Sequence, residues 1–253
     1  MSVHAINESY KHKIEIPYGI RLAFELKQKF NIDEPDLNTL INNIHNNPNS
    51  KKIMDYIQQD INNHLFLCKD CHLCKEEHHS QKVPGVGPLN SPLVLIGEGP
   101  GFDEDKAGKP FVGRAGQLLT TILNKLNVSR EKVYITNIVK CRPPNNRQPL
   151  ADETNKCSKN LELELMFIMP KVIITLGSTP LNYFKPNSRI TKSRGKWIFK
   201  DNKLIMPTFH PAYILRQKGK NLVKIKWEVW HDFNKAVDKA KELCPEYNFK
   251  LHT

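Results

Sequence analysis

Three closely spaced cysteines are the first residues of this sequence whose types and spacing could support chemistry. Cys68, Cys71 and Cys74 follow one another with two residues between them. A single CxxC pair is a moderate metal signal, and thiolates at this pitch can ligate zinc or wrap an iron-sulfur cluster. Because a structural zinc ion usually draws its ligands from two separated pairs, the overlapping pairs favour a cluster.

A glycine-rich segment is the second candidate for chemistry. GEGPG at residues 97–101 directly follows the apolar run PLVLI. Glycines just after a strand let the backbone approach a ligand closely, although a plain tight loop has the same composition. No Gly-Lys-Ser/Thr follows, and the spacing is not GxGxxG, so neither common phosphate-binding motif is present.

Alternating strands and helices must position these segments. From residue 92 onward the apolar runs PLVLIG, KVYITNIV, KVIITLG and KLIMPTFH are separated or followed by helical patterns. Runs this rich in Val, Ile and Leu indicate a mostly parallel sheet covered on both faces. The predicted fold is therefore α/β, with three α/β/α layers and a four-stranded, mainly parallel sheet. Helices are expected over about 115–126, 152–169, 178–184 and 226–243.

Ligands of such sheets bind at the carboxyl ends of the strands. In this chain the strands are followed by GEGPG, by Asn137 and KCRPPNNR, by Gly177 and Ser178, and by His210 in TFHPAYIL. A lone His or Asn is usually structural, but both beyond strands of one sheet favour a functional site.

Residues 1–63 differ from the rest in composition, being polar and rich in Lys, Asn and Ile. We expect a partly helical amino-terminal extension, with an asparagine-rich linker and a helix that leads into the first cysteines. That helix is indicated by apolar residues at helical spacing, namely Ile53, Tyr56, Ile57, Ile61 and Leu65.

The charge balance favours a polyanionic partner. Lys and Arg outnumber Asp and Glu by 38 to 26, so nucleic acid is expected before an anionic membrane surface. No apolar run is long enough for a signal peptide or a membrane span. The sequence therefore predicts a cytoplasmic, nucleoid-associated protein that does not engage a membrane.

With these residues in view, the chain resembles the family 4 uracil-DNA glycosylases, the iron-sulfur, thermophile-type members of their superfamily. The match runs from about Leu67 to about Leu243 and rests on four segments in the family's order. They are GEGPG with EDKAGKPFVGRAGQLL, then YITNIVKCRPPNNR, then MPKVIITLGS, and then PTFHPAYIL.

The resemblance implies a uracil-DNA glycosylase-like catalytic domain over residues 64–253. It implies monofunctional hydrolysis of the N-glycosidic bond of uracil in DNA, which leaves an abasic site during base excision repair. The expected partner is single- or double-stranded DNA that contains uracil, bound by a monomer.

The resemblance also implies a 4Fe-4S cluster held by Cys68, Cys71, Cys141 and Cys157. The family pattern CxxCxL selects the first two of these and leaves Cys74 as an extra thiol. Cys244 has no counterpart in the family. Zinc remains the alternative metal.

Roles in base recognition follow from the same resemblance. Phe111 would stack on the extruded base, and the side-chain amide of Asn137 would read the uracil edge with a donor and an acceptor. His210 would stabilise the charge that collects on the uracil oxygen as the bond breaks.

The GEGPG segment would form one wall of the pocket through Gly97 and Gly99. The best-known relatives carry an Asp that positions the attacking water where this chain has Gly99. Glu98 is our candidate for that task, with a backbone carbonyl as the alternative.

Two basic runs without acids flank the histidine segment, at residues 185–200 and 216–226. Such runs are usually solvated surface, but here they suit phosphate binding by Arg194 and Arg216. Ile214 and Leu215, directly after the histidine, are expected either to wedge into the base stack or to be buried.

Two rival functions belong to different classes. One is an enzyme of the same superfamily that traps uracil covalently through a loop histidine. That family carries GEQPG, whereas this chain has Gly99, and its run SRITKSRGK contains no histidine. The other rival is a non-catalytic iron-sulfur protein that binds DNA, against which the intact Phe111, Asn137 and His210 argue.

Overall fold

The apolar runs after residue 92 form one sheet in the computed structural model, which describes residues 25–30, 39, 43–44, 50–75 and 81–250. The strand order is β2-β1-β3-β5-β4, and only the β4–β5 pair is antiparallel. In chain order the strands are β1 (Leu93–Gly97), β2 (Tyr134–Asn137), β3 (Val172–Leu176), β4 (Ile198–Lys200) and β5 (Lys203–Thr208).

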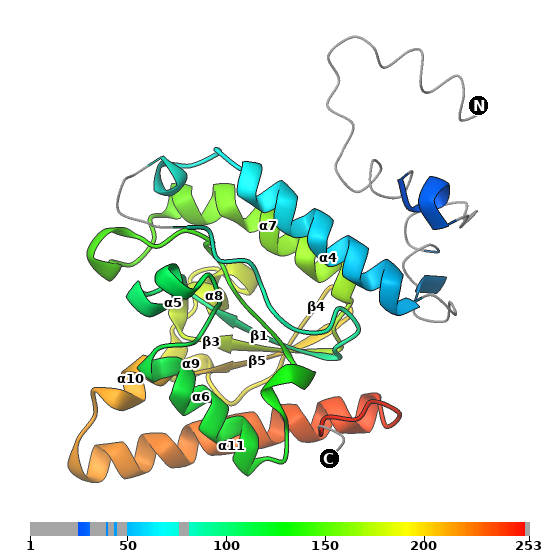
Figure 1. The fold of residues 1–253 in the computed structure, drawn as a ribbon. Helices are drawn as coiled ribbons and strands as arrows, with labels where there is room; N and C mark the ends of the chain where they lie inside the picture. The colour runs from blue at the N-terminus through cyan, green and yellow to red at the C-terminus, as the bar shows by residue number, and fades with distance from the viewer. Residues whose placement is uncertain (1–24, 31–38, 40–42, 45–49, 76–80, 251–253) are drawn as a thin grey trace. The chain divides into compact units, whose positions relative to one another are not determined.

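The three inner runs are strands buried along their whole length. Every residue of β1, β2 and β3 is buried, which is the pattern of parallel strands with helices on both faces. The register pairs Gly97 with Asn137, the last residues of β1 and β2. Figure 1 shows the arrowheads of β1, β3 and β5 pointing to one side of the molecule, so their carboxyl ends share an edge.

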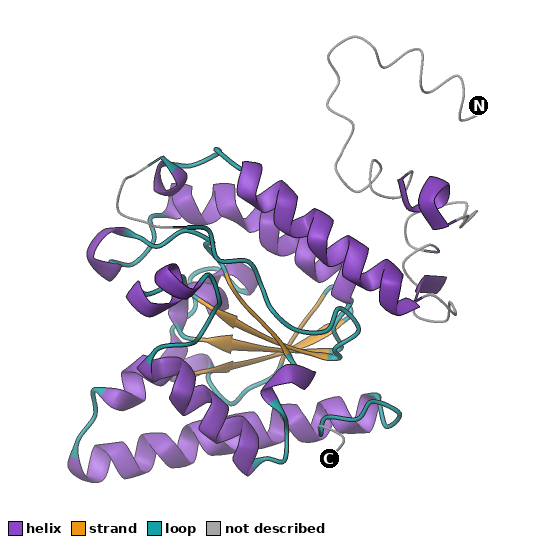
Figure 2. Ribbon diagram, viewed as in Figure 1, coloured by secondary structure: helices purple, strands orange, loops and turns teal. Residues whose placement is uncertain are grey.

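Helices cover the two faces of this sheet (Figure 2). On one face, sheet residues such as Leu95 and Ile174 share a core with Leu123 of α6 (Arg114–Lys125) and Phe233 of α11 (Gly219–Leu243). On the other, α7 (Ala151–Ile168) is tied to β2 by Glu164, whose carboxylate accepts a hydrogen bond from the Thr136 hydroxyl at 2.7 Å. The predicted three-layer α/β architecture is confirmed.

Short helices gather beside the carboxyl ends of the strands. They are α5 (Phe102–Ala107), α8 (Ser178–Phe184), α9 (Ile190–Ser193) and α10 (Pro211–Leu215). Three short 3-10 turns, η1 (His72–Cys74), η2 (Arg130–Lys132) and η3 (Pro144–Asn146), complete the connections. The short helices therefore surround the edge where the sequence predicts a site.

The chain divides into two compact units, residues 1–61 and 62–253. The helix α4 (Ser50–Leu67) begins in the first and ends in the second. Of the predicted apolar positions, Ile53, Ile57, Ile61 and Leu65 are buried and Tyr56 is partly buried. The helix leading into the first cysteines is confirmed. Most of the asparagine-rich segment lies outside the described residues.

Two elements differ from the sequence prediction. The sheet has five strands rather than four, because the three-residue β4 pairs at its edge, with exposed side chains in place of an apolar run. The last helix begins at Gly219 rather than near Lys226. The first turns of α11 are dominated by basic residues, and Ile225 is the first buried apolar residue of the helix. The apolar pattern that indicates a helix is therefore weaker in these turns than in the later ones.

Candidate active site

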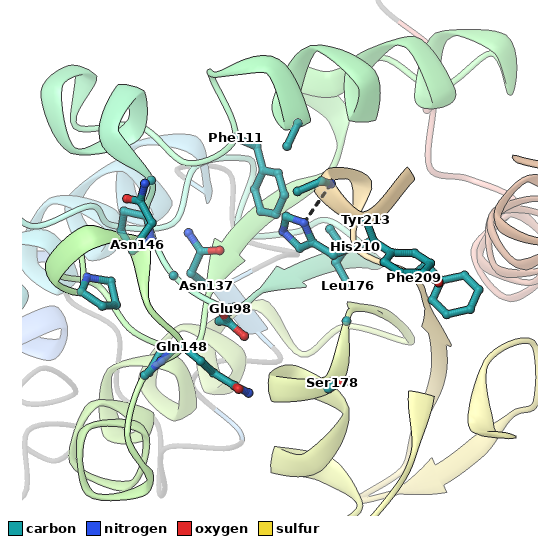
Figure 3. Close-up of a pocket in the computed structure, with 18 of the residues that line it drawn as sticks. Glu98, Phe111, Asn137, Asn146, Gln148, Leu176, Ser178, Phe209, His210 and Tyr213 are labelled. Carbon is teal, nitrogen blue, oxygen red and sulfur yellow. Dashed lines mark hydrogen bonds between the residues drawn. The ribbon is translucent and has the colours of Figure 1, made fainter. Parts of the chain in front are cut away.

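The carboxyl ends of the strands open into a cavity of about 700 Å³. Residues from the loops after β1 and β3 line this cavity. The chain order of the strands in the sheet reverses between β1 and β3. This is where ligands bind in open α/β sheets. Of the predicted base and water contacts, the structure brings together five around this cavity (Figure 3), namely Glu98, Gly99, Phe111, Asn137 and His210.

Asn137 is the last residue of β2, and its side chain faces the cavity. The side chain is 2 % exposed, and its Oδ1 atom has no hydrogen-bond partner in the described part of the chain. A buried amide oxygen without a partner costs about 1–3 kcal/mol. The site thus holds an open acceptor that a bound N–H donor would satisfy.

Gly97 and Gly99 keep this part of the cavity open. A Cβ atom on Gly97 would lie 2.3 Å from Asn137 Oδ1 and 2.5 Å from Phe111 Cζ. A Cβ atom on Gly99 would lie 2.6 Å from Cγ2 of Val139. Only a glycine lets the loop pass this close to the amide, the ring and the chain beyond β2.

Phe111 presents its ring to the cavity from a strained backbone. Its φ angle is +53°, a left-handed conformation that bulky residues adopt rarely and that marks functional constraint. Glu104 holds this loop, because its Oε1 accepts the backbone N–H groups of Val112 and Gly113 at 3.0 and 2.9 Å. The other oxygen of Glu104 accepts from the backbone N–H of Gly101 at 3.1 Å, which joins the loop to GEGPG.

His210 lies directly before α10, with its ring 5.6 Å from that of Phe111 between centroids. Its Nδ1 accepts the backbone N–H of Ala212 at 3.1 Å, shown as the dashed line in Figure 3. Burial, together with the charge of Arg216, lowers the pKa of His210 to about 4. The imidazole is therefore neutral at pH 7, and because Nδ1 accepts, its proton is on Nε2.

Glu98 is held in place by a chain of side chains. The Thr179 hydroxyl donates to Glu98 Oε2 at 2.5 Å and accepts from Nε2 of Gln148 at 3.0 Å. The carbonyl oxygens of Gly97 and Glu98 already accept backbone N–H groups from Ile138 and Val139. The carboxylate of Glu98 is thus a fixed acceptor at the cavity wall.

Sequence reasoning did not identify Glu104, Thr179 or Gln148 as site residues. Glu104 stands three residues after Gly101, the spacing at which an acidic residue returns to the start of a helix, so this signal was present. Thr179 and Gln148 come from separate segments, and only the folded chain brings them to Glu98. No local pattern indicates that contact.

The two residues proposed as a wedge have different environments. Ile214 is 2 % exposed and belongs to the hydrophobic core, so its assignment as a DNA contact is wrong. Leu215 is 43 % exposed. Helical geometry turns adjacent residues by about 100°, which separates the two side chains. Arg216, the next residue, was expected to contact phosphate, and its side chain lines the cavity.

Arg194 also differs from its predicted role. Its Nε and Nη2 atoms bind the two carboxylate oxygens of the buried Asp232 at 2.9 and 2.5 Å, and Nη2 also donates to the Glu228 carbonyl. The Thr208 hydroxyl donates to the same carboxylate. The guanidinium therefore fastens its loop to α11 and β5, and its predicted role as a phosphate contact is wrong.

The four cysteines of the implied cluster lie close enough to influence one another electrostatically. Burial, and next the thiols of Cys157 and Cys71, raise the pKa of Cys141. Burial raises the pKa of Cys157 to about 11, with smaller contributions from Cys71 and Cys68. The backbone N–H of Lys140 donates to Cys157 Sγ at 3.3 Å. Four thiols from three separate segments thus share one neighbourhood.

Cys74 donates its thiol proton to the Cys71 carbonyl at 2.8 Å. In the described part of the chain, no group of three or more His, Cys, Asp or Glu side chains is spaced to hold a single metal ion. The described helices also include none that is long and apolar enough to cross a membrane.

Comparisons with known proteins agree with this geometry. The family model of the uracil DNA glycosylase superfamily matches residues 84–234. A type-4 uracil-DNA glycosylase of Thermotoga maritima is 45 % identical over 69 % of this chain and 91 % of its own length. Type-4 enzymes of Sulfurisphaera tokodaii and Archaeoglobus fulgidus are 43 % and 48 % identical, over 74 % and 73 % of this chain and 86 % and 92 % of their own lengths. The chain therefore belongs to the uracil-DNA glycosylase superfamily and, within it, to the type-4 uracil-DNA glycosylases.

Proposed function

We propose that this chain is a monofunctional uracil-DNA glycosylase of base excision repair, with its activity in residues 64–253. It hydrolyses the bond between uracil and deoxyribose and leaves an abasic site. The observation that carries the proposal is the buried Asn137 amide, whose Oδ1 has no hydrogen-bond partner among the described residues and faces a cavity shared with Phe111 and His210. This arrangement suits a flat base that offers one N–H donor and carbonyl acceptors.

Asn137 distinguishes uracil from cytosine through this open acceptor. Uracil carries a proton on N3, which Asn137 Oδ1 accepts, and a carbonyl oxygen at C4, which the amide nitrogen of Asn137 contacts. Cytosine presents an unprotonated N3 and an amino group at these positions, so both contacts become repulsive. Because the Asn137 amide is buried, an unmatched base leaves its polar atoms without partners, which is costly.

Phe111 and His210 meet two different requirements of the reaction, which are holding the extruded base and stabilising the negative charge on it. The Phe111 ring stacks on the extruded base. As the N1–C1′ bond breaks, both bonding electrons go to uracil, and the Nε2–H of neutral His210 donates a hydrogen bond to the uracil O2 that becomes negative. A donor placed in advance at such an oxygen is worth about a hundredfold to a thousandfold in kcat.

Glu98 positions and deprotonates the water that attacks C1′. Its carboxylate is fixed by Thr179 and lies on the cavity wall. The water oxygen forms the new bond to C1′, the proton passes to Glu98, and the released uracil anion leaves the site. The carbonyls of Gly97 and Glu98 each already accept one hydrogen bond, and a carbonyl oxygen does not take up a proton near neutral pH, whereas a carboxylate has free lone pairs and can accept the proton of the water.

The four cysteines fit the implied cluster. Cys68, Cys71, Cys141 and Cys157 provide four soft thiolate ligands, and these need not converge on one point because each binds a different iron. When bound, a 4Fe-4S cluster supplies a covalent cross-link among the segment before the sheet, the loop after β2 and α7. The Lys140 N–H that reaches Cys157 is the kind of hydrogen bond that supports a ligating sulfur.

DNA contact outside the base falls to residues near the cavity. Arg216 meets the phosphate beside the extruded nucleotide, and exposed Leu215 occupies the space that the base leaves in the stack. Both follow His210 closely in the chain, so the extruded base and these contacts share one short segment.

The decisive assay uses the purified protein with oligonucleotides that contain one uracil, single- or double-stranded, followed by alkali. We expect strand scission at uracil only after alkali, with Asn137→Ala reducing the rate at least about a hundredfold. Lys125→Gln, at the exposed end of α6 and outside the residues that line the cavity, is a control in the same unit. Absence of scission with the wild type would defeat the proposal, and a denaturation-resistant adduct would favour the uracil-trapping rival.

A further inference from the structure

The outer face of α11 carries an exposed aromatic pair that the reaction does not use. Trp227 is 58 % exposed. Its indole stacks on the imidazole of His231, with ring centroids 4.8 Å apart and planes 20° apart. An exposed tryptophan that is held in one orientation by a second ring presents a flat, pre-ordered surface.

Positive charge accompanies this pair along the helix. Lys220, Lys224, Trp227 and His231 are spaced by four, three and four residues and are all exposed, so they share one face. The acids on the adjoining face, Glu228 and Asp232, pair with Arg194. Within the described part of the chain, no ion pair involves Lys220 or Lys224. This face therefore begins near the cavity with two exposed cations and continues to the aromatic stack.

We propose that the Trp227–His231 pair is an accessory platform for an unpaired base of single-stranded DNA, with Lys220 and Lys224 contacting the phosphates that lead to it. Stacking on an aromatic ring beside a basic track is how proteins bind single strands without sequence preference. A second copy of this chain fits less well, because it would set lysine against lysine. This inference rests on the proposed function, because it assumes that one DNA strand binds both the cavity and the Trp227–His231 pair.

The helix sets the length of strand that the platform requires. Trp227 lies eight residues beyond Gly219, where α11 begins close to cavity-lining Arg216, which is about 12 Å along the helix axis. At about 3.4 Å per stacked nucleotide, this corresponds to roughly four nucleotides. Extension of a strand beyond this length on one side of the uracil should therefore strengthen binding.

The test measures fluorescence anisotropy of uracil-free single strands of about 5 and about 15 nucleotides, because undamaged DNA reports the platform independently of base excision. Trp227→Ala should weaken binding of the longer strand at least about fivefold and remove most of the advantage in affinity that the longer strand has over the shorter one. Phe199→Ala is the matched control. Phe199 is a 70 % exposed aromatic residue on β4, paired with Leu204 near the start of β5 and so at the end of the sheet away from the cavity.

A salt titration tests the lysines separately. The Lys220→Gln/Lys224→Gln double variant should reduce the slope of log affinity against log salt by about 1.4, since each phosphate contact with a single strand contributes about 0.7. Equal affinity of wild type and Trp227→Ala for the long strand would overturn the platform. So would a dimer in sedimentation that Trp227→Ala dissolves. Loss of excision with unchanged strand binding would instead sink the proposed function alone.

Discussion

The protonation of His210 gives a prediction whose size follows from the structure. Burial and the neighbouring Arg216 lower its pKa from 6.5 to about 4. Between these values the unfolded chain binds a proton that the folded chain does not, so acid favours unfolding. From pH 7 to pH 5, His210 should reduce the free energy of unfolding by about 2 kcal/mol.

Urea unfolding of wild type and His210→Asn at pH 7 and pH 5 measures this contribution, because all other titrating groups are common to both proteins. The variant should lose about 2 kcal/mol less than the wild type over this interval. Arg216→Gln removes the neighbouring positive charge but not the burial of His210. Its loss of unfolding free energy between pH 7 and pH 5 should therefore be smaller than that of the wild type, but larger than that of His210→Asn. Equal pH dependence of wild type and His210→Asn would refute the assignment.

The neutral imidazole also has a kinetic consequence. If His210 donates from Nε2 without a positive charge, kcat/KM should show no ionisation of this residue between pH 6 and pH 8. Single-turnover excision over that range measures it. An apparent pKa between 6 and 7 that disappears in His210→Asn would show that the charged form acts, against the geometry at Nδ1.

Three further predictions follow from individual contacts. Gly97→Ala places a methyl group 2.3 Å from the buried amide oxygen of Asn137 on the neighbouring strand, so kcat/KM should fall at least about a hundredfold with an unchanged circular dichroism spectrum. Thr179→Val frees the carboxylate of Glu98 and should lower kcat by about tenfold or more with little change in KM, and Thr179→Ser should restore it. Cys157→Ser should lose the visible absorbance of the cluster and unfold at lower temperature, whereas Cys74→Ser should keep both.

The arrangement of the site could be predicted from the sequence because it depends on the sheet. Buried Val/Ile/Leu runs fix parallel strands, and parallel strands place whatever follows them at one edge. Asn137 and His210 are 73 positions apart in the numbering, yet Asn137 ends β2 and His210 lies two residues beyond the end of β5. The sequence therefore predicts that Asn137 and His210 lie around one cavity, even without any knowledge of how the side chains pack.

The errors arose where a local pattern was read without its distant partners. The run around Arg194 contains no acid, but α11 brings buried Asp232 to it from 38 positions further along. Ile214 and Leu215 are indistinguishable in type, and only the packing of α10 decides which of them is exposed. The edge strand β4 is three residues long and largely exposed, so it lacks the apolar signal by which the other strands were recognised.

The clamp on Phe111 shows why the cavity is ready for a base before one arrives. A left-handed φ angle on a phenylalanine costs of order 1–3 kcal/mol and persists only when its surroundings fix it. Here Glu104 binds the next two backbone N–H groups, and Arg130 donates to the carbonyl of Pro110 at 2.6 Å. Gly116 packs so closely that a Cβ atom would lie 1.9 Å from the Phe111 oxygen. Since folding already fixes the ring, an extruded uracil meets an ordered surface, and its binding does not have to order that loop.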